Sequence, residues 1–407
     1  MGARAPRALQ GATTGGLRGR ATQEWDGKGS QASPEGTAVN WVHTGYAQQI
    51  RFKAGVIDEA GKVVRDLGAR RAMLVTTPGR LASAAGERLV RALGGVLAST
   101  FEGVRSHVPG SSVQEALRQA RRDGIDAVIS FGGGSCADLG KAVCFFTEAG
   151  TPGTSFFDRP ALLHVSIPTT YSGAELTPFF GMTDEAAGRK TGAGGPTIAP
   201  AVALYDPEVT LDLPPRVSAE TGMNALAHCV EAAWSPVRTP EAEAIALAGI
   251  ERISRALPAV VRNPADLAFR EEMFAGAVLG GRCLQNASMG VHHGLCQLLG
   301  GRTGIPHGLA NAVVLAHAVR FNAGAVPDAV ARIAAALGVP TGDAAAAIDA
   351  LREALGLPGR LVACGVRRED LEAVARMAPS NPNVAANPRP VTPEDVRFIL
   401  DAAFGGP

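Results

Sequence analysis

Apolar positions change their spacing about halfway along the chain. In the first half, short apolar runs alternate with stretches whose apolar residues recur every three or four positions, patterns typical of buried strands and of helices. Strands are predicted at 48–57, 72–76, 96–101, 127–131 and 162–168, and helices at 61–67, 82–93, 113–123 and 137–146. This alternation predicts a parallel sheet covered by helices on both faces.

After Pro214 and Pro215 the strand-like runs disappear and Ala-rich helical periodicity continues. Helices are predicted at 216–234, 240–256, 266–282, 284–299, 308–321, 327–337, 343–355, 368–377 and 393–404. We therefore expect an α/β domain with a Rossmann-like parallel sheet at 46–213 and an all-α domain at 214–407. The ligand cleft should lie between the second domain and the C-terminal edge of the sheet, where open α/β folds bind ligands.

Two segments lack such periodicity. Residues 1–45 are rich in Gly, Ala, Arg, Ser and Thr, and we expect them to form a disordered tail. Several arginines precede the first acid, Glu24, which gives the tail a faint likeness to a transit peptide. Residues 147–161 are rich in Gly, Pro and Thr and are predicted to form a surface loop.

Composition narrows the classes of function. The chain has 407 residues, 46% of them hydrophobic, which is enough for two domains with a large core. Its net charge of +1 gives no general attraction to nucleic acid or to an anionic membrane, and no apolar run is long enough to span a bilayer. The six cysteines include no C-x-x-C pair and are predicted to be reduced, mostly buried thiols of a cytoplasmic protein.

A glycine-rich string follows the predicted strand at 127–131. It reads Gly132-Gly133-Gly134-Ser135 and leads directly into a predicted helix. Glycines let a backbone approach a phosphate, and a helix N-terminus offers free N–H groups, so this string is a candidate nucleotide loop. The alternative is an ordinary tight turn, with Asp138 as an acid at the helix start and Lys141 as a solvated charge.

Hydroxyl side chains cluster after the strand at 162–168. Thr169 and Thr170 follow that strand directly and Thr177 lies just beyond, so these side chains could bind a ribose or a pyrophosphate. A polar turn explains the cluster equally well. Lys190 is a further candidate for a phosphate or ribose contact, although a solvated charge in a hairpin is the more ordinary interpretation.

A third constellation consists of Asn224, His228, His293 and His307. Asn224 and His228 are four residues apart on a predicted helix and therefore share a face. With His293 and His307 they could bind iron or zinc, and the alternative is polar packing in the core. The neutral amide of Asn224 counts against a divalent ion. His292 should point to a different face from His293, so only one of the two is expected in the site.

Several strings together resemble the iron-containing alcohol dehydrogenase family and, within it, the maleylacetate reductase branch. The resemblance covers residues from about 48 to 404 and includes the nucleotide loop with Asp138 and Lys141. The strings that resemble the reductase branch are Thr77-Pro78-Gly79, His107-Val108-Pro109, Pro168-Thr169-Thr170-Tyr171, Leu204-Tyr205-Asp206-Pro207, Gly222-Met223-Asn224-Ala225-Leu226-Ala227-His228 and His292-His293-Gly294-Leu295-Cys296.

The resemblance implies a dehydroquinate synthase-like architecture, an NADH or NADPH cofactor and specific site residues. The cofactor would contact Thr77, His107, Gly133, Gly134, Ser135, Asp138, Thr169, Thr170, Thr177 and Lys190. The catalytic residues would be His228, His293 and His307. Asn224, His228, His293 and His307 occupy the metal positions of the family, and the branch commonly carries Asn at the first, so Fe(II) or Zn(II) would be optional.

The activity implied is reduction of maleylacetate, a small dicarboxylate, to 3-oxoadipate, in a protein that we expect to be a homodimer. Two positions depart from the branch: Gln297 stands where it usually has histidine, and Ala174 where it usually has serine. Thr77 stands where NAD-preferring members often have Asp, which leaves the choice of NADH or NADPH open. The alternatives are an oxidoreductase for another small alcohol, aldehyde or ketone, and an inactive nucleotide-binding homologue.

Overall fold

The computed structural model describes residues 41, 43–148, 160–186 and 189–405. Most of the predicted tail at 1–45 and most of the predicted loop at 147–161 lie outside these residues. Within the described part of the chain, no helix is both long enough and apolar enough to cross a membrane.

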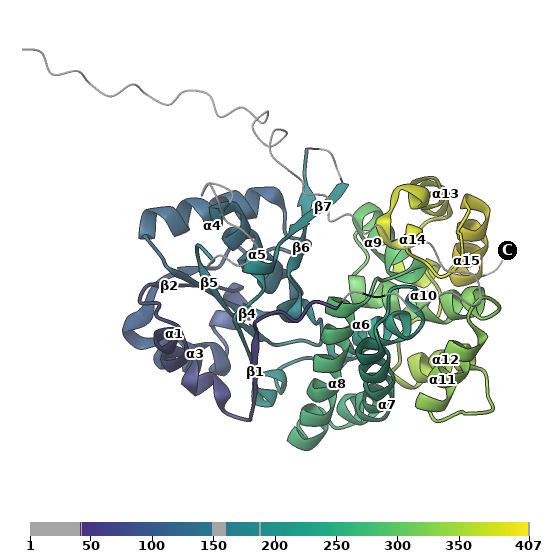
Figure 1. Cartoon of the computed structure of the whole chain (residues 1–407), viewed down its shortest axis with the longest axis horizontal. Coiled ribbons are helices and arrows are strands. Elements are labelled where there is room, and N and C mark those ends of the chain that lie inside the picture. The colour runs from purple at the N-terminus through teal and green to yellow at the C-terminus, as the bar shows by residue number, and fades with distance from the viewer. Residues whose placement is uncertain (1–40, 42, 149–159, 187–188, 406–407) are drawn as a thin grey trace, which may run out of the picture.

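The first half of the chain forms a six-stranded parallel sheet in the order β1-β8-β5-β4-β2-β3 (Figure 1). The strands are β1 (Gln49–Phe52), β2 (Ala72–Val75), β3 (Leu97–Phe101), β4 (Ala127–Gly132), β5 (Leu163–Pro168) and β8 (Val202–Tyr205). The predicted parallel sheet is therefore confirmed. The sequence pattern missed β8, a four-residue strand between β1 and β5.

Helices cover both faces of this sheet, because alternate residues of each strand face opposite ways. The helices are α1 (Ala60–Asp66), α2 (Pro78–Leu81), α3 (Ala84–Leu93), α4 (Gly110–Asp123) and α5 (Gly134–Glu148). On β4, Ile129 packs in a buried cluster with Leu89 of α3, whereas Val128 packs in another cluster with Leu139 of α5. Both faces of the sheet are thereby removed from water.

An antiparallel hairpin projects from this half toward the helical half (Figure 1). Its strands are β6 (Phe179–Asp184) and β7 (Arg189–Gly194). The sequence did not predict these strands. They are rich in Gly and Thr and most of their described side chains are partly exposed, so they carry no regular alternation of apolar and polar positions.

The second half is helical. Its helices are α6 (Pro215–Trp234), α7 (Pro240–Arg262), α8 (Leu267–Asn286), α9 (Val291–Thr303), α10 (His307–Asn322), α11 (Pro327–Ala336), α12 (Ala344–Ala354), α13 (Arg368–Met377), α14 (Pro382–Ala385) and α15 (Pro393–Phe404). Helix α6 is buried along almost its whole length, and its buried residues include the polar side chains of Asn224, His228 and Glu231. Helices α6, α7 and α8 share one apolar core, and α9, α10, α13 and α15 share another.

One predicted helix, at 284–299, is wrong. Helix α8 continues to Asn286, the backbone is extended at Ala287, and α9 begins only at Val291. The N–H groups at the start of α9 are satisfied by Glu231 of α6 rather than by a local capping residue. Local sequence therefore contains no signal for this helix start.

Candidate functional site

The glycine string forms the turn between β4 and α5. A side chain at Gly132 would collide with Cys136, and a Cβ on Gly133 would lie 3.1 Å from Thr170 Cγ2. A Cβ on Gly134 would lie 3.3 Å from the side chain of Ser172. Glycine is therefore required for the close approach of this turn to the segment after β5, and α5 begins beside a row of hydroxyl groups.

The hydroxyl groups that are predicted to contact the cofactor differ in whether they already form hydrogen bonds within the protein. Among the described residues, the buried hydroxyls of Thr169, Thr170 and Ser172 have no hydrogen-bond partner. Thr177 instead accepts a hydrogen bond from Lys141 at 2.7 Å, and Thr77 caps α2 by accepting from the Arg80 N–H at 3.3 Å. The hydroxyls next to the glycine string are thus the ones left for a ligand.

Lys141 is not the solvated charge that the sequence allowed. Its side chain is fully buried, and its Nζ donates to Thr177 Oγ1, to Ala174 O at 2.8 Å and to Phe179 O. The same Nζ lies 2.9 Å from Asp138 Oδ1. Lys141 therefore ties the segment after β5 to α5, the helix that begins at the glycine string.

The predicted polar constellation comes together from three helices. Asn224 and His228 lie on α6, His293 on α9 and His307 at the start of α10. The rings of His228 and His293 have centroids 4.7 Å apart, and those of His293 and His307 are 5.9 Å apart. Three buried atoms of this group, Asn224 Oδ1, His228 Nδ1 and His293 Nε2, have no hydrogen-bond partner within the described ranges.

A single turn links the glycine string to these histidines. Gly173 follows the hydroxyl row with a left-handed φ of 76°, and a Cβ there would lie 2.8 Å from Gly281 Cα and 3.8 Å from His228 Nδ1. Ser172, its neighbour, packs on Gly134. The candidate nucleotide loop and the histidine group therefore belong to one continuous site.

His107 and Lys190, from the part of the chain that contains the sheet, lie against α9. A Cβ on Gly300 would be 3.9 Å from His107 Cε1, and one on Gly301 would be 3.7 Å from Lys190 Cγ. His107 has a φ of 64° and its neighbour Val108 a φ of 49°, conformations that non-glycine residues rarely adopt. The hairpin holds this turn, since Thr183 donates a hydrogen bond to each of the two carbonyls at 2.9 Å.

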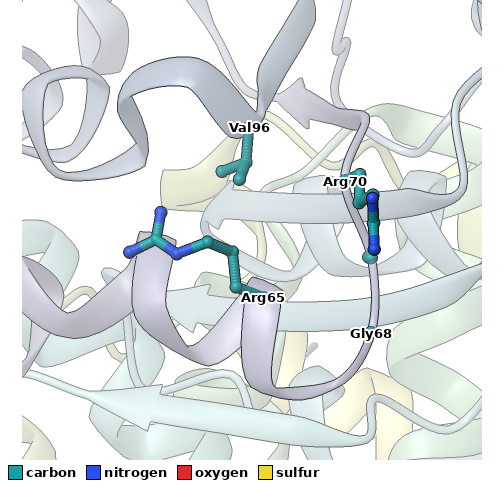
Figure 2. A pocket seen from close by; sticks show the side chains of 5 residues that line it. Arg65, Gly68, Arg70 and Val96 are labelled. Atoms are coloured by element: carbon teal, nitrogen blue, oxygen red, sulfur yellow. The ribbon is translucent and has the colours of Figure 1, made fainter.

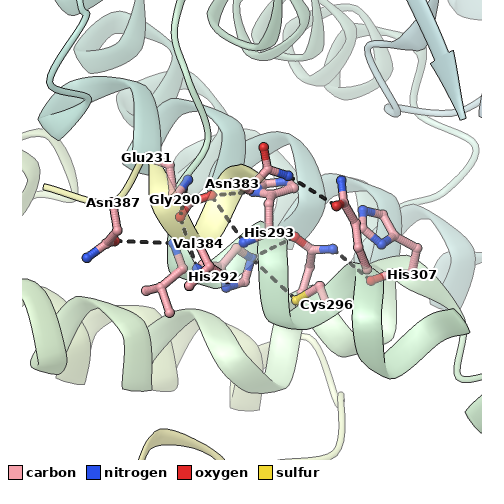
Figure 3. A network of polar contacts seen from close by, with 12 residues as sticks. Glu231, Gly290, His292, His293, Cys296, His307, Asn383, Val384 and Asn387 are labelled. Atoms are coloured by element: carbon pink, nitrogen blue, oxygen red, sulfur yellow. Dashed lines mark hydrogen bonds and ion pairs between the residues drawn. The ribbon is translucent and has the colours of Figure 1, made fainter. Parts of the chain in front are cut away.

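Glu231 is a residue of the site that sequence reasoning missed. Its Oε2 accepts a hydrogen bond from His293 Nδ1 at 2.5 Å, and its carboxylate also accepts from the N–H groups of Gly290, His292 and His293 (Figure 3). The side chain is fully buried. Its position three residues after His228 on α6, on the same helical face, is the signal that could have identified it.

His292 points away from its neighbour, as the sequence predicted. Its Nε2 donates to Asn311 Oδ1 at 2.7 Å, and Asn311 donates in turn to the backbone carbonyl of His307 at 2.8 Å. His292 therefore joins α9 to α10, while His293 faces the site.

Burial sets the charge of the histidines. Burial, reinforced by the neighbouring histidines, lowers the pKa of His228 well below its usual value. Burial also lowers the pKa of His307 well below its usual value, with further contributions from His293 and Lys190. Burial is the largest influence on Glu231 and acts to raise its pKa, but the hydrogen bonds from the His293 ring and backbone, together with the charges of His293 and His292, outweigh burial, so the pKa is lowered. His228 and His307 are therefore neutral near pH 7, and Glu231 is a carboxylate.

The expected ligand set does not fit a divalent metal as arranged. Among the described residues, no group of three or more His, Cys, Asp or Glu side chains is placed to hold an ion. Asn224 offers a neutral amide oxygen, and the carboxylate of Glu231 is engaged by four N–H donors. These residues, as placed, therefore do not support a catalytic step through a bound metal.

Gln297 belongs to a cluster of amides beside the histidines. Its Oε1 accepts hydrogen bonds from Asn383 Nδ2 at 3.1 Å and Asn381 Nδ2 at 3.4 Å. It lies one helical turn after His293 on α9, so it contributes a neutral side chain next to the site.

A separate hollow of about 390 Å³ lies elsewhere on the molecule (Figure 2). It is lined by Arg65, Gly68, Ala69, Arg70 and Val96. These residues precede β2 and β3, so the hollow lies at the N-terminal edge of the sheet. The glycine string leaves β4 at the C-terminal edge, so the hollow is not part of the candidate site.

Comparison with known proteins identifies the family. The model of the iron-containing alcohol dehydrogenases matches residues 47–207, and that of the C-terminal part of the same family matches residues 218–404. The maleylacetate reductase of Burkholderia cepacia is 37% identical over 88% of this chain and 96% of its own length. That of Rhizobium sp. strain MTP-10005 is 37% identical over 90% of this chain and 98% of its own length.

A solved structure of a maleylacetate reductase has the same fold as this chain. The maleylacetate reductase of Agrobacterium tumefaciens superposes with a TM-score of 0.80 at 35% identity, covering 90% of this chain and 99% of its own. The predicted resemblance is thus confirmed. The chain belongs to the iron-containing alcohol dehydrogenase family and is an NAD(P)-dependent oxidoreductase.

Proposed function

We propose that this protein reduces the C=C bond of maleylacetate to give 3-oxoadipate, with NADH or NADPH as the hydride donor. The observation that carries the proposal is the group of unpartnered polar atoms at Asn224, His228 and His293, which lies beside the segment that packs on the glycine string. Within this group the ring nitrogens of His228 and His293 can, as N–H donors, stabilise an oxygen on which negative charge develops, whereas the amide oxygen of Asn224 can only accept a hydrogen bond. The likeness to maleylacetate reductases over nearly their whole length supports the same substrate.

Residues at the C-terminal edge of the sheet would hold the cofactor. The N–H groups of Gly134 and Ser135, where α5 begins, would bind its pyrophosphate, and Gly133 would allow the close approach. Thr169 and Thr170 contribute hydroxyl groups, and Asp138, Thr177, His107 and Lys190 line the path toward the histidines. Thr77, two residues after β2, would reach the ribose through its O–H, and because Thr77 is uncharged, it does not by itself select between NADH and NADPH.

The reaction needs one hydride and one proton. When bound, the nicotinamide would supply hydride to the alkene carbon β to the ketone; the electron pair of the C=C bond would then form the enolate double bond while the C=O π pair moves to the ketone oxygen. His228 and His307 are neutral and donate N–H hydrogen bonds to the resulting enolate. His293 holds the proton that is delivered to the carbon α to the ketone, which leaves 3-oxoadipate and the oxidised cofactor.

The proposed substrate is a dianion, and Lys190 of the hairpin is a cation that lies against α9.

We further propose that the protein is a cytoplasmic homodimer. Symmetric dimers are the commonest assemblies of soluble enzymes. The six cysteines, all within the described residues, are free thiols, as expected in a reducing compartment.

The test is turnover by the purified protein. Maleylacetate should cause loss of nicotinamide absorbance with NADH, NADPH or both. No oxidation with either cofactor, in protein freed of metal and in protein loaded with Fe(II) or Zn(II), would overturn the assignment. A parallel screen of small alcohols with oxidised cofactor addresses the alternative, and faster turnover there would favour an alcohol dehydrogenase.

A further inference from the structure

We propose that Glu231 is a positioning residue, which fixes the orientation of the His293 ring through Nδ1 and so aims Nε2 at the reacting substrate. The kinetic part of this inference rests on the proposed function. Its geometric part does not, because every contact on which it depends lies within the protein.

The carboxylate of Glu231 is saturated with donors. Oε1 accepts from the N–H groups of Gly290 at 3.0 Å and His292 at 3.1 Å. Oε2 accepts from the N–H of His293 at 3.3 Å and from its Nδ1 at 2.5 Å. Four N–H groups converge on two oxygens in a fully buried place, which requires a side chain that only accepts hydrogen bonds.

This arrangement leaves one orientation for the His293 ring. Turning the ring over would bring a C–H group to Oε2 and lose the 2.5 Å hydrogen bond. With Nδ1 engaged, Nε2 faces the site, where it is buried and has no partner among the residues that the structure describes. A hydrogen bond to one ring nitrogen is the usual means by which proteins set the role of the other.

The same carboxylate joins two elements of the site. Helix α9 begins at Val291, and its N-cap, Gly290, has no side chain with which to accept a hydrogen bond. Glu231 supplies the missing acceptor. It lies on α6, the helix that also carries Asn224 and His228. Displacement of Glu231 would therefore move His293 relative to the other two residues, and not only free its ring.

A double-mutant cycle separates positioning from simple support of the fold. Glu231→Gln keeps the shape but supplies one oxygen for four donors. Kcat with maleylacetate should fall about ten- to hundredfold, the range for a lost partner of a functional histidine, while KM for the nicotinamide cofactor changes less than about twofold. In a His293→Ala background, Glu231→Gln should cause less than about a threefold further loss, because the ring on which it acts is gone.

A matched control is Glu220→Gln, the same substitution on the same helix at a residue paired with the exposed Arg216. It should leave kcat within about twofold. Equal losses from Glu231→Gln in the wild-type and His293→Ala backgrounds would overturn positioning in favour of general structural support. An unchanged kcat in folded Glu231→Gln protein would also overturn it.

A measurement on the wild-type protein tests the geometry without any substrate. The buried Nδ1–H of His293 should give a far-downfield, slowly exchanging proton resonance in NMR of protein labelled with ¹⁵N-histidine. The signal should be absent from His293→Ala. Absence of such a resonance from the wild type would overturn the inference, whereas its presence without maleylacetate turnover would leave the inference standing and reject only the proposed substrate.

Discussion

Replacement of Lys141 by methionine tests how the cofactor loop is held. Methionine has nearly the same length, but it cannot donate to Ala174 O, Thr177 Oγ1 or Phe179 O, and it leaves Asp138 without its cation. The two carbonyls can still accept from Thr177, but three hydrogen bonds to a charged donor are lost, and each such bond contributes about 1.5–3 kcal/mol. Asp138 is 25% exposed and keeps some contact with water, so its share is small.

We therefore expect the variant to lose about 3 kcal/mol or more of unfolding free energy, measured by urea denaturation followed by fluorescence. Cofactor affinity, measured by titration, should fall as well, because the tie from α5 to residues 174–179 is removed. The control is Lys62→Met, which breaks another Lys–Asp pair on a helix but at a site where the lysine is 67% exposed. That change should cost at most about 1 kcal/mol. Equal losses of unfolding free energy in the two variants would show that Lys141 does not hold the segment after β5.

Further predictions concern the site and its surroundings. His228→Ala should lower kcat roughly a hundredfold while cofactor binding, measured by fluorescence, is retained, and an unchanged kcat would place the chemistry elsewhere. Gly133→Val should weaken cofactor binding more than tenfold, since its Cβ would lie 3.1 Å from Thr170 Cγ2, and normal affinity would contradict the close approach. Burial lowers the pKa of His164 to about 3. Since the unfolded histidine titrates near 6.5, its contribution to stability is complete above that pH and falls by about 1.4 kcal/mol per unit as the pH drops below it. Denaturation of the wild type and of His164→Asn at several pH values should show a shallower decline for the variant, and identical slopes would contradict this assignment.

The sequence predicted the sheet because β2, β4 and β5 are buried apolar runs bounded by turn residues. It also placed Asn224 and His228 on one face of α6 from their spacing, and it separated His293 from His292 correctly. These features depend on local periodicity, which the sequence displays directly.

Other features depend on contacts between distant segments. The start of α9 is set by Glu231, 59 residues before Gly290 in the chain, so no local cap marks it. The burial of Lys141 follows from carbonyl groups more than 30 residues away, which have no sequence signature. The unpartnered state of the histidine nitrogens likewise emerges only when three helices are packed together.

In the proposed reaction, hydride reaches the alkene carbon of maleylacetate and not a carbonyl carbon. Turnover with a nicotinamide cofactor that carries deuterium at both C4 positions, followed by NMR of the product, locates the transferred hydride. We expect 3-oxoadipate with one deuterium on the carbon β to the ketone. Deuterium on a newly formed hydroxyl-bearing carbon, or no transfer to maleylacetate at all, would contradict the proposed reaction.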